Sequence, residues 1–159
     1  MSAPVPNSAD ADLDGLDPAH AARVRDSWNR QALLATLGAR LLRVGPGIAE
    51  IELPVSPHVA QQHGFVHAGA VSTIADTACG YAALTTMDAD SAVLTAEFKI
   101  NLMAPAAGER LVARARVVRS GRTLTVALCE VEAEAGGSRK TVALMTATLA
   151  SVRGKGLSG

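Results

Sequence analysis

Between Glu52 and Asp88 the sequence contains only one Asp, Glu, Lys or Arg, which is Asp76. A helix on a protein surface normally carries a stripe of charged side chains. Here the apolar residues recur at helical spacing, and the face that bears Asp76 has only Thr and Gly beside it. We therefore expect a long helix that is covered on nearly all sides, in part by another subunit. The apolar face comprises Val71, Ile74, Ala75, Ala78 and Ala82.

The apolar segment from Ala68 to Met87 is long enough to span a bilayer. It has Asp76 near its centre, however, and a charge at the middle of a membrane is costly. The segment is therefore predicted to be a buried helix of a globular core, with no membrane partner.

The patterns along the chain predict a single domain. Residues 1–16 are expected to form a disordered tail, residues 17–153 one domain, and residues 154–159 a C-terminal tail. Hairpins in succession after the long helix predict an α+β fold with an antiparallel sheet. The expected elements are a helix over 18–37, strands at 41–44 and 48–55, a loop at 56–66, the long helix, and strands at 94–102, 110–119, 123–134 and 140–152.

The strand after the long helix alternates with a period of two. One face is expected to hold apolar side chains, and the other Thr95, Glu97, Lys99 and Asn101, which predicts a half-buried strand. A single sheet with one covering helix leaves an edge and a face exposed, so self-association is expected. The apolar set is Leu94, Ala96, Phe98, Ile100 and Leu102.

Asp76 has two interpretations. A carboxylate in apolar surroundings loses hydration, and buried carboxylates of this kind are candidates for catalysis. The alternative is a structural Asp that accepts hydrogen bonds from backbone amides or from Thr77. Burial alone leaves both interpretations open.

The expected start of the long helix, His67-Ala68-Gly69, adds a second chemical group. The first N–H groups of a helix have no partner within the helix and lie at the positive end of its dipole. They could hold an anion or a developing oxyanion. Asp76 lies roughly 13 Å further along the helix, too far to share one reacting carbon with these amides. The carboxylate of a neighbouring subunit could meet them instead, which favours a dimer.

These residues resemble the signature of the hotdog-fold acyl-CoA thioesterases of the phenylacetate-degradation (PaaI) type, which includes the 4-hydroxybenzoyl-CoA thioesterases. The resemblance covers about residues 20–152 and implies a hotdog fold, an antiparallel sheet wrapped around one long central helix, here with an extra N-terminal helix. The residues that carry it are Gln61, Gly64, His67-Ala68-Gly69 and Asp76, the strand Glu97–Leu102 with Pro105 and Gly108, and the hairpin Gly121-Arg122-Thr123.

The resemblance implies a role for each catalytic candidate. Asp76 would be the nucleophile or the general base for water, and the N–H of Ala68 would polarise the thioester carbonyl. Gln61 would position the water or steady the carbonyl, and His67 would shape the helix start without acting as the base. The substrate-binding candidates are Gly69, Thr73, Thr77 and Arg122.

Two positions depart from the family pattern. The family usually has Gly at the position of Ala68, so the added methyl group places the acyl preference in question. Gly80 stands where one branch of the family has a hydroxyl-bearing residue one turn after its acid. Thr73 or Thr77 could supply that hydroxyl instead.

The implied function is hydrolysis of the thioester of a small, aromatic or medium-chain acyl-CoA by a homodimer or a tetramer built from two dimers, with no cofactor. One alternative is a non-catalytic acyl-CoA-binding hotdog module. The presence of Asp76 and Gln61 argues against it. Another is a hotdog dehydratase or hydratase, which the Gln-Gly-His-x-Gly spacing argues against.

Composition and residue spacing also bear on partners, location, metal binding and the cysteines. A net charge of zero and 3% aromatic residues argue against a nucleic-acid partner. The first residues lack the features of a signal peptide, so a cytoplasmic location is expected. His63 and His67 have no third ligand nearby, and no metal site is predicted. Cys79 and Cys129 are expected to be buried free thiols.

Arginines are concentrated in the stretch from Arg110 to Arg122, which contains no acidic residue. Arg110, Arg114 and Arg116 share one face of the expected strand. They could form a solvated outer face of the sheet, or a patch for the phosphates of coenzyme A. Arg122, in the hairpin, is the candidate for the second possibility.

Overall fold

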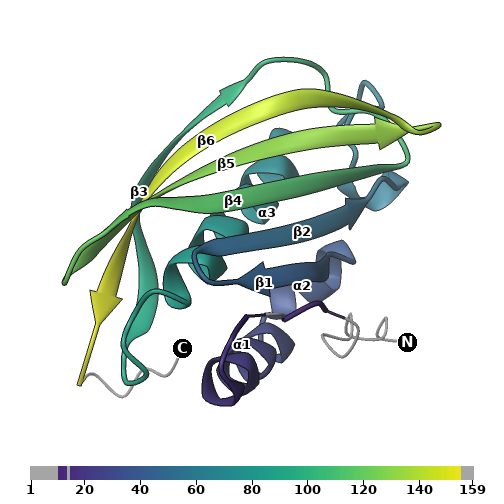
Figure 1. Cartoon of the computed structure of the whole chain (residues 1–159). Helices are drawn as coiled ribbons and strands as arrows, with labels where there is room; N and C mark the ends of the chain where they lie inside the picture. Colours follow the sequence, from purple (N-terminus) through teal and green to yellow (C-terminus); the bar gives the residue numbers. More distant parts are fainter. Residues whose placement is uncertain (1–10, 14, 155–159) are drawn as a thin grey trace.

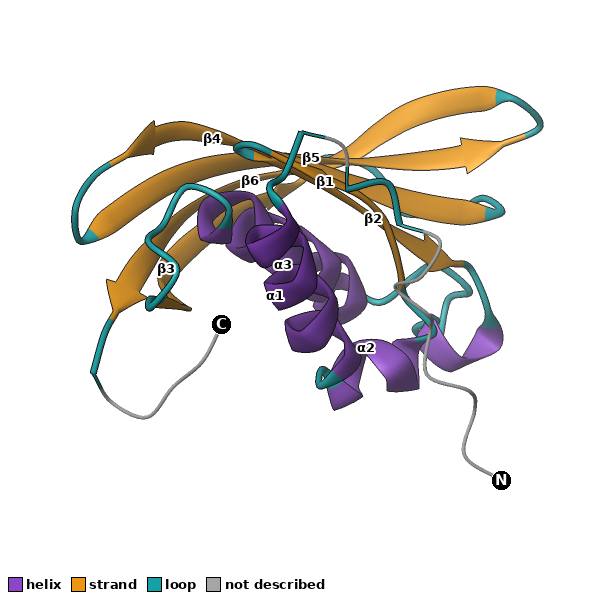
Figure 2. Ribbon diagram, turned by 60° about the horizontal axis from the view of Figure 1, so that its bottom comes forward, coloured by secondary structure: helices purple, strands orange, loops and turns teal. Residues whose placement is uncertain are grey.

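The computed structural model describes residues 11–13 and 15–154, so residues 1–10, 14 and 155–159 of the expected tails lie outside the described residues. Within the expected N-terminal tail, the N–H of Asp12 donates to the carbonyl of Leu42 at 2.9 Å, and its carbonyl accepts from the N–H of Val44 at 2.8 Å, so this part of the tail is ordered. Its elements form a six-stranded antiparallel sheet with helices on one face (Figures 1 and 2). The elements are α1 (Pro18–Asn29), α2 (Ala32–Leu37), β1 (Arg40–Gly45), β2 (Ile48–Pro54), the short 3-10 helix η2 (Pro57–Val59), α3 (Ala68–Leu84), β3 (Ala92–Leu102), β4 (Arg110–Ser120), β5 (Leu124–Ala135) and β6 (Ser138–Val152).

The N-terminal helical region is two helices and not the single one expected over residues 18–37. Asp17 caps α1 by accepting hydrogen bonds from the N–H groups of residues 19 and 20, and Pro18 occupies the first helical position. The chain leaves the helical conformation at Gln31, whose φ and ψ are −84° and 85°. This break allows both Trp28 of α1 and Leu34 of α2 to be buried.

The strand order is β1-β2-β4-β5-β6-β3, and every pair is antiparallel. The sheet curves around α3, which packs against all six of its strands (Figure 2). This arrangement confirms the α+β prediction of a sheet wrapped around one long helix. It also places β1 at one edge of the sheet and β3 at the other.

The core is mainly aliphatic and lies between α3 and the concave face of the sheet. Many of the buried positions of α3 are alanines, which allow the helix to approach the strands closely. Cys79 and Cys129 lie in this core as free, fully buried thiols, as expected. No helix formed by the described residues is long and apolar enough to cross a bilayer.

A β-bulge in β3 changes which of its side chains face the helix. The register with β6 shifts between Thr95 and Glu97, so Ala96 is an extra residue in the strand. Thr95 pairs with the buried Leu149 and faces α3, as Phe98 does further along the strand. The predicted alternation is therefore wrong at the start of the strand, because a bulge cannot be recognised from a period of two.

β3 is also more exposed than a half-buried strand. It is an edge strand of 11 residues, and its pairing partner in the sheet is β6 alone. Leu94, Phe98 and Leu102 are 51%, 44% and 54% exposed. The exposed apolar side chains lie along an edge whose outer side has no neighbouring strand among the described residues.

Candidate functional site

Asp76 lies in the middle of α3 and faces the start of β3. Its Oδ1 accepts a hydrogen bond of 2.8 Å from the hydroxyl of Thr95. The two side chains border a cavity of about 240 Å³ between α1, α3 and β3. The cavity is lined by Ser27, Gln31, Asp76, Thr77, Gly80, Tyr81, Ala92, Val93, Leu94 and Thr95.

Burial raises the pKa of Asp76 above its ordinary value, and the hydrogen bond from Thr95 offsets only part of this effect. No cation pairs with Asp76 in the part of the chain that the structure describes. A carboxylate that is partly desolvated, unpaired and open to a cavity is a better nucleophile or proton acceptor than a hydrated one. The structure therefore favours a chemical role over a purely structural one.

Thr95 is a contact of Asp76 that the sequence pattern does not indicate. The period of two along the strand predicts that the side chain of Thr95 lies on the polar face, away from the helix. The bulge at Ala96 turns it toward Asp76 instead, and bulges are frequent beside active sites. The sequence carried no signal for this contact, because the two residues lie on different elements.

Gly80 leaves open space beside Asp76, one turn further along α3. A Cβ atom at this position would meet nothing within 4 Å. Glycine inside a helix costs about 1 kcal/mol relative to alanine, so packing within the described chain does not explain its presence. The open cavity above the helix accounts for the glycine at this position.

We expect Gly80→Ala to raise the free energy of unfolding by about 0.5–1 kcal/mol, because the helix loses its most flexible interior residue. Urea denaturation at constant pH measures this change. Gly69→Ala is the matched comparison, since a Cβ there would lie 3.0 Å from Nδ1 of His67 and gain little or no stability. Equal stabilisation by both substitutions would contradict this description of the cavity.

The start of α3 has the geometry expected for an oxyanion or anion site. His67 is the N-cap residue, and its Nδ1 accepts a hydrogen bond of 2.9 Å from the N–H of Gly69. With Nδ1 used in this way, His67 caps the helix start, and its part in the reaction stays a prediction. The N–H of Ala68 has no acceptor among the described residues and lies on an exposed turn.

The loop before α3 holds Gln61 in a local network. Its Oε1 accepts a hydrogen bond of 2.6 Å from the N–H of His63, and its own N–H donates to the carbonyl of Phe65 at 2.8 Å. Gly64 has a φ of +84°, which suits glycine. Neither Gln61 nor Ala68 lines the cavity beside Asp76 in the same chain.

The substrate-binding candidates lie at different places in the structure, and not all of them are at the cavity. Thr77 lines the cavity with Asp76, whereas the hydroxyl of Thr73 donates to the carbonyl of Gly69 in its own helix, at 2.8 Å. Arg122 is exposed in the turn between β4 and β5. The assignment of all four candidates to substrate binding, Thr77 included, stays a prediction.

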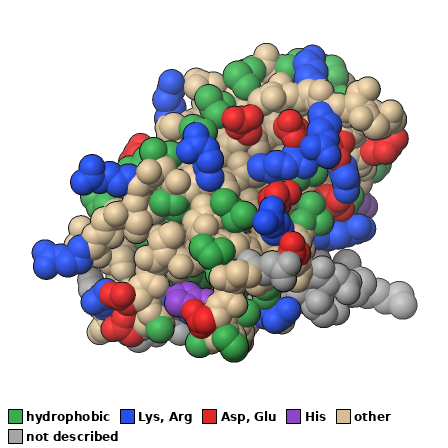
Figure 3. Space-filling view, viewed as in Figure 1, with side chains coloured by type: hydrophobic (Ala, Val, Ile, Leu, Met, Phe, Trp, Pro, Cys, Tyr) green, Lys and Arg blue, Asp and Glu red, His purple; other side chains and the backbone are tan. Residues whose placement is uncertain are grey.

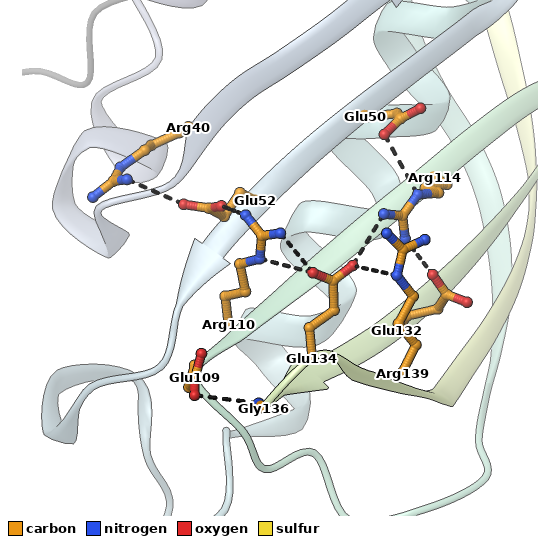
Figure 4. A network of polar contacts seen from close by, with 10 residues as sticks. All are labelled: Arg40, Glu50, Glu52, Glu109, Arg110, Arg114, Glu132, Glu134, Gly136 and Arg139. Atoms are coloured by element: carbon orange, nitrogen blue, oxygen red, sulfur yellow. Dashed lines mark hydrogen bonds and ion pairs between the residues drawn. The ribbon is translucent and has the colours of Figure 1, made fainter.

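Two of the arginines of β4, Arg110 and Arg114, form ion pairs on the outer face of the sheet (Figure 4). Arg110 contacts Glu52 and Glu134 at 2.6 Å each, and Arg114 contacts Glu134 at 3.1 Å. Figure 3 shows basic and acidic side chains interspersed over this end of β4–β6. The network favours a structural outer face over a phosphate patch for Arg110 and Arg114, because their charges are already neutralised.

Partial burial alone would raise the pKa of Glu134, but hydrogen bonds from Arg114 and Arg110 outweigh it and lower the pKa. The acidic partners come from β2 and β5, which flank β4. The sequence analysis considered the arginines of one strand by themselves and therefore missed these partners.

No group of three or more His, Cys, Asp or Glu side chains gathers as a metal site among the described residues. His63 and His67 lie in the loop and at the N-cap, not on one helical face.

Comparisons with known proteins assign the family. The family model "Thioesterase superfamily" matches residues 63–140, which include the helix start and Asp76. The crystal structure of a thioesterase family protein from Silicibacter pomeroyi is 51% identical in sequence, with a TM-score of 0.83 over 85% of this chain and 99% of that one. The chain belongs to the thioesterase superfamily. This thioesterase is thus a thioester hydrolase, as the sequence resemblance implied.

Other solved structures share the fold of this thioesterase. A conserved protein from Pseudomonas aeruginosa is 30% identical, with a TM-score of 0.70 over 77% of this chain and 94% of that one. The E. coli PaaI protein from the phenylacetic acid degradation operon is 24% identical, with a TM-score of 0.78 over 88% of this chain and 98% of that one. The predicted hotdog fold is confirmed.

Proposed function

We propose that this thioesterase hydrolyses acyl-CoA thioesters at sites shared by two copies of the chain. In each site Asp76 of one copy acts on the thioester carbon, and the N–H of Ala68 of the other copy binds the carbonyl oxygen. The observation that carries the proposal is a pair of groups on α3 that, among the described residues, keep bonding capacity for a ligand. One is the carboxylate of Asp76, which borders a cavity and has no cation beside it, and the other is the N–H of Ala68 at the helix start, which has no acceptor.

These two groups are too far apart to act together within one chain. Asp76 follows Ala68 by about two turns of helix, roughly 12 Å of rise. Catalysis requires donors about 3 Å from the developing oxyanion. A second copy must therefore supply one of the two groups.

The exposed edge of β3 supports pairing with a second copy. Long apolar sheet edges are normally covered, because their free N–H and C=O groups pair readily with another strand. A twofold axis across β3 would join two sheets into one by antiparallel pairing. This edge supports self-association as a dimer, and a dimer of dimers would use a second surface as well.

Antiparallel pairing of β3 also brings the required groups together. Asp76 contacts Thr95, near the start of β3. The helix start is tied to the opposite end, because the N–H of Val66 donates to the carbonyl of Ala106, four residues after β3, at 2.8 Å. In an antiparallel pair the start of one β3 lies beside the end of the other. Asp76 of one copy would then face Ala68 of the other.

The chemistry follows from these positions. Asp76 either attacks the carbonyl carbon or accepts a proton from the attacking water, and both routes require its ionised form. Negative charge develops on the carbonyl oxygen, where the N–H of Ala68 and the helix dipole stabilise it. The C–S bond then breaks, and the thiolate of coenzyme A leaves and takes up a proton. If water attacked the carbon, the free acid forms directly. If Asp76 attacked it, the acyl group remains as an anhydride on Asp76, and water hydrolyses this anhydride to release the free acid and restore the carboxylate.

Thr95→Val tests the contact that fixes Asp76. Loss of the hydroxyl removes a bond that lowers the pKa of Asp76, so the acid limb of the pH–rate profile should move to higher pH. We also expect a decrease in kcat of about 10- to 100-fold, since a hydrogen bond to a charged group contributes about 1.5–3 kcal/mol. Thr146→Val, on the exposed outer face of β6, is the matched control. An unshifted acid limb would rule out this role for Thr95.

The proposed activity is tested by the release of free thiol from short-chain, medium-chain and aromatic acyl-CoAs by the wild-type protein. Turnover of at least one class is expected. If none is hydrolysed, the proposal fails. Retained acyl-CoA binding in calorimetry would then indicate a binding module.

A further inference from the structure

We propose that the outer edge of β1 is a second strand-pairing surface of this chain, and that residues 11–16 form a strap that keeps a second copy from pairing there. Residue 14 lies outside the described residues, and the rest of the strap is described. Pairing of copies through β3 belongs to the proposed function, whereas the covering of β1 rests on contacts within one chain.

The strap bonds the backbone groups on the outer side of β1. The N–H of Asp12 donates to the carbonyl of Leu42 at 2.9 Å, and the carbonyl of Asp12 accepts from the N–H of Val44 at 2.8 Å. Asp12 and Arg43 thus form a parallel bridge, the contact with which a further strand of the sheet would begin. A strand of a second copy would have to displace Asp12 to reach the same two groups.

Apolar side chains hold the strap against the domain. Ala11 is buried, and Leu13 and Leu16 pack against the core. The ion pair between Asp12 and Arg43, at 3.6 Å and about half exposed on both sides, adds little. The strap is therefore held by its backbone bonds and apolar contacts more than by its charge.

The strap is too short to act as a new edge strand. Among its described residues, Asp12 alone forms a bridge to β1. Gly15 then turns the chain with a φ of +80°, and a Cβ atom there would lie 3.3 Å from Cδ of Pro46 in the turn after β1. The sequence has Asp10, Asp12 and Asp14 at alternate positions, and acidic side chains of this kind deter the approach of a further strand.

The two edges of the sheet therefore differ. β3 leaves Leu94, Phe98 and Leu102 exposed along an edge that no described segment covers. If β1 were open as well, β1 of one copy could pair with β3 of the next, and such head-to-tail contacts can continue without closing. With β1 covered, pairing through β3 alone is twofold, so assembly through sheet edges stops at two copies.

Deletion of residues 1–13 removes the part of the strap that bonds β1, and deletion of residues 1–10 is the matched control that leaves it in place. Analytical ultracentrifugation measures the mean mass at increasing protein concentration. For the wild type and the control we expect the same mass throughout. For the longer deletion we expect a mean mass that rises about twofold or more with concentration, while circular dichroism retains a cooperative thermal transition.

Asp12→Pro is a second variant in case the longer deletion does not fold. It removes the N–H that bonds Leu42, whereas Asp12→Asn keeps this N–H and loses only the charge. The mass of Asp12→Pro should rise with concentration, and the mass of Asp12→Asn should match that of the wild type.

Two results would overturn the role of the strap. One is a wild-type mass at every concentration for the folded deletion variant and for Asp12→Pro. The other is a mass that rises only together with loss of the thermal transition, since the strap would then stabilise the fold without guarding an edge. A wild type that is monomeric at every concentration would instead overturn the shared site, and the comparison of the two deletions would still decide the role of the strap.

Discussion

Replacing Asp76 with Asn is expected to lower kcat for acyl-CoA hydrolysis by about a thousandfold, whether the carboxylate is the nucleophile or the base. Asn has nearly the same shape, and its oxygen can still accept the hydrogen bond from Thr95, so the cavity should persist. The loss should appear in kcat more than in KM, because the carboxylate acts in the transition state. Release of free thiol under saturating substrate measures it.

The same variant is expected to be more stable than the wild type at neutral and alkaline pH. At a pH below the ordinary carboxyl range, Asp76 is protonated in both the folded and the unfolded chain and adds no pH dependence. Burial raises its pKa in the folded chain. As the pH rises through that raised pKa, ionisation therefore lowers the free energy of unfolding. Asn cannot ionise, so the variant does not lose this stability. The Tm of the variant should therefore exceed that of the wild type at neutral and alkaline pH, and the difference should vanish at acidic pH.

Asp90→Asn is the matched control, because Asp90 is exposed and pairs only loosely with Arg153 at 3.7 Å. It should keep wild-type kcat and should not show the same pH-dependent gain in Tm. If Asp76→Asn instead retained full activity, Asp76 could not be the essential carboxylate. A Tm of Asp76→Asn below that of the wild type at pH 8 would show that the partly buried, ionised carboxylate does not destabilise the fold.

Replacing Ala68 with Pro is expected to lower kcat by about 10²–10³-fold, the usual cost of losing one oxyanion donor. Proline lacks the backbone N–H but is well tolerated at the first position of a helix. Ala68 is that first position, and His67 before it has a φ of −62° and a ψ of 137°, which proline allows. The substitution should therefore remove the donor and keep the helix.

Ala68→Gly is the control for this variant, because it keeps the N–H and removes only the methyl group. It should remain active, with altered preference among acyl groups if the methyl group narrows the site. Circular dichroism and Tm check that Ala68→Pro is folded. Full activity of a folded Ala68→Pro protein would exclude the N–H of Ala68 as the oxyanion donor.

Much of this description could be predicted from the sequence because the relevant signals are local. The lone charge at Asp76 indicated a covered helix, and Asp17-Pro18 marked the start of α1. The His67-x-Gly69 pattern has a direct structural basis, since Gly69 leaves room for the Nδ1 contact at the helix cap. Hairpin order also predicted the antiparallel sheet.

Features that depend on contacts between distant elements could not be predicted. The bulge at Ala96, which turns Thr95 toward Asp76, leaves no mark in the alternation of side chains. The acidic partners of Arg110 lie on neighbouring strands, 24 and 58 residues away in sequence. The contact between Gln31 and Tyr81 depends on where α1 and α2 pack.

The most direct test of the shared site is a heterodimer of two inactive variants. Asp76→Asn and Ala68→Pro chains with different affinity tags are co-expressed, and the mixed dimer is purified through both tags. One of its two sites would combine an intact Asp76 with an intact Ala68 N–H, so about half of wild-type kcat is predicted. Activity no higher than that of the two homodimers, or failure of the chains to copurify, would contradict a site formed by two copies.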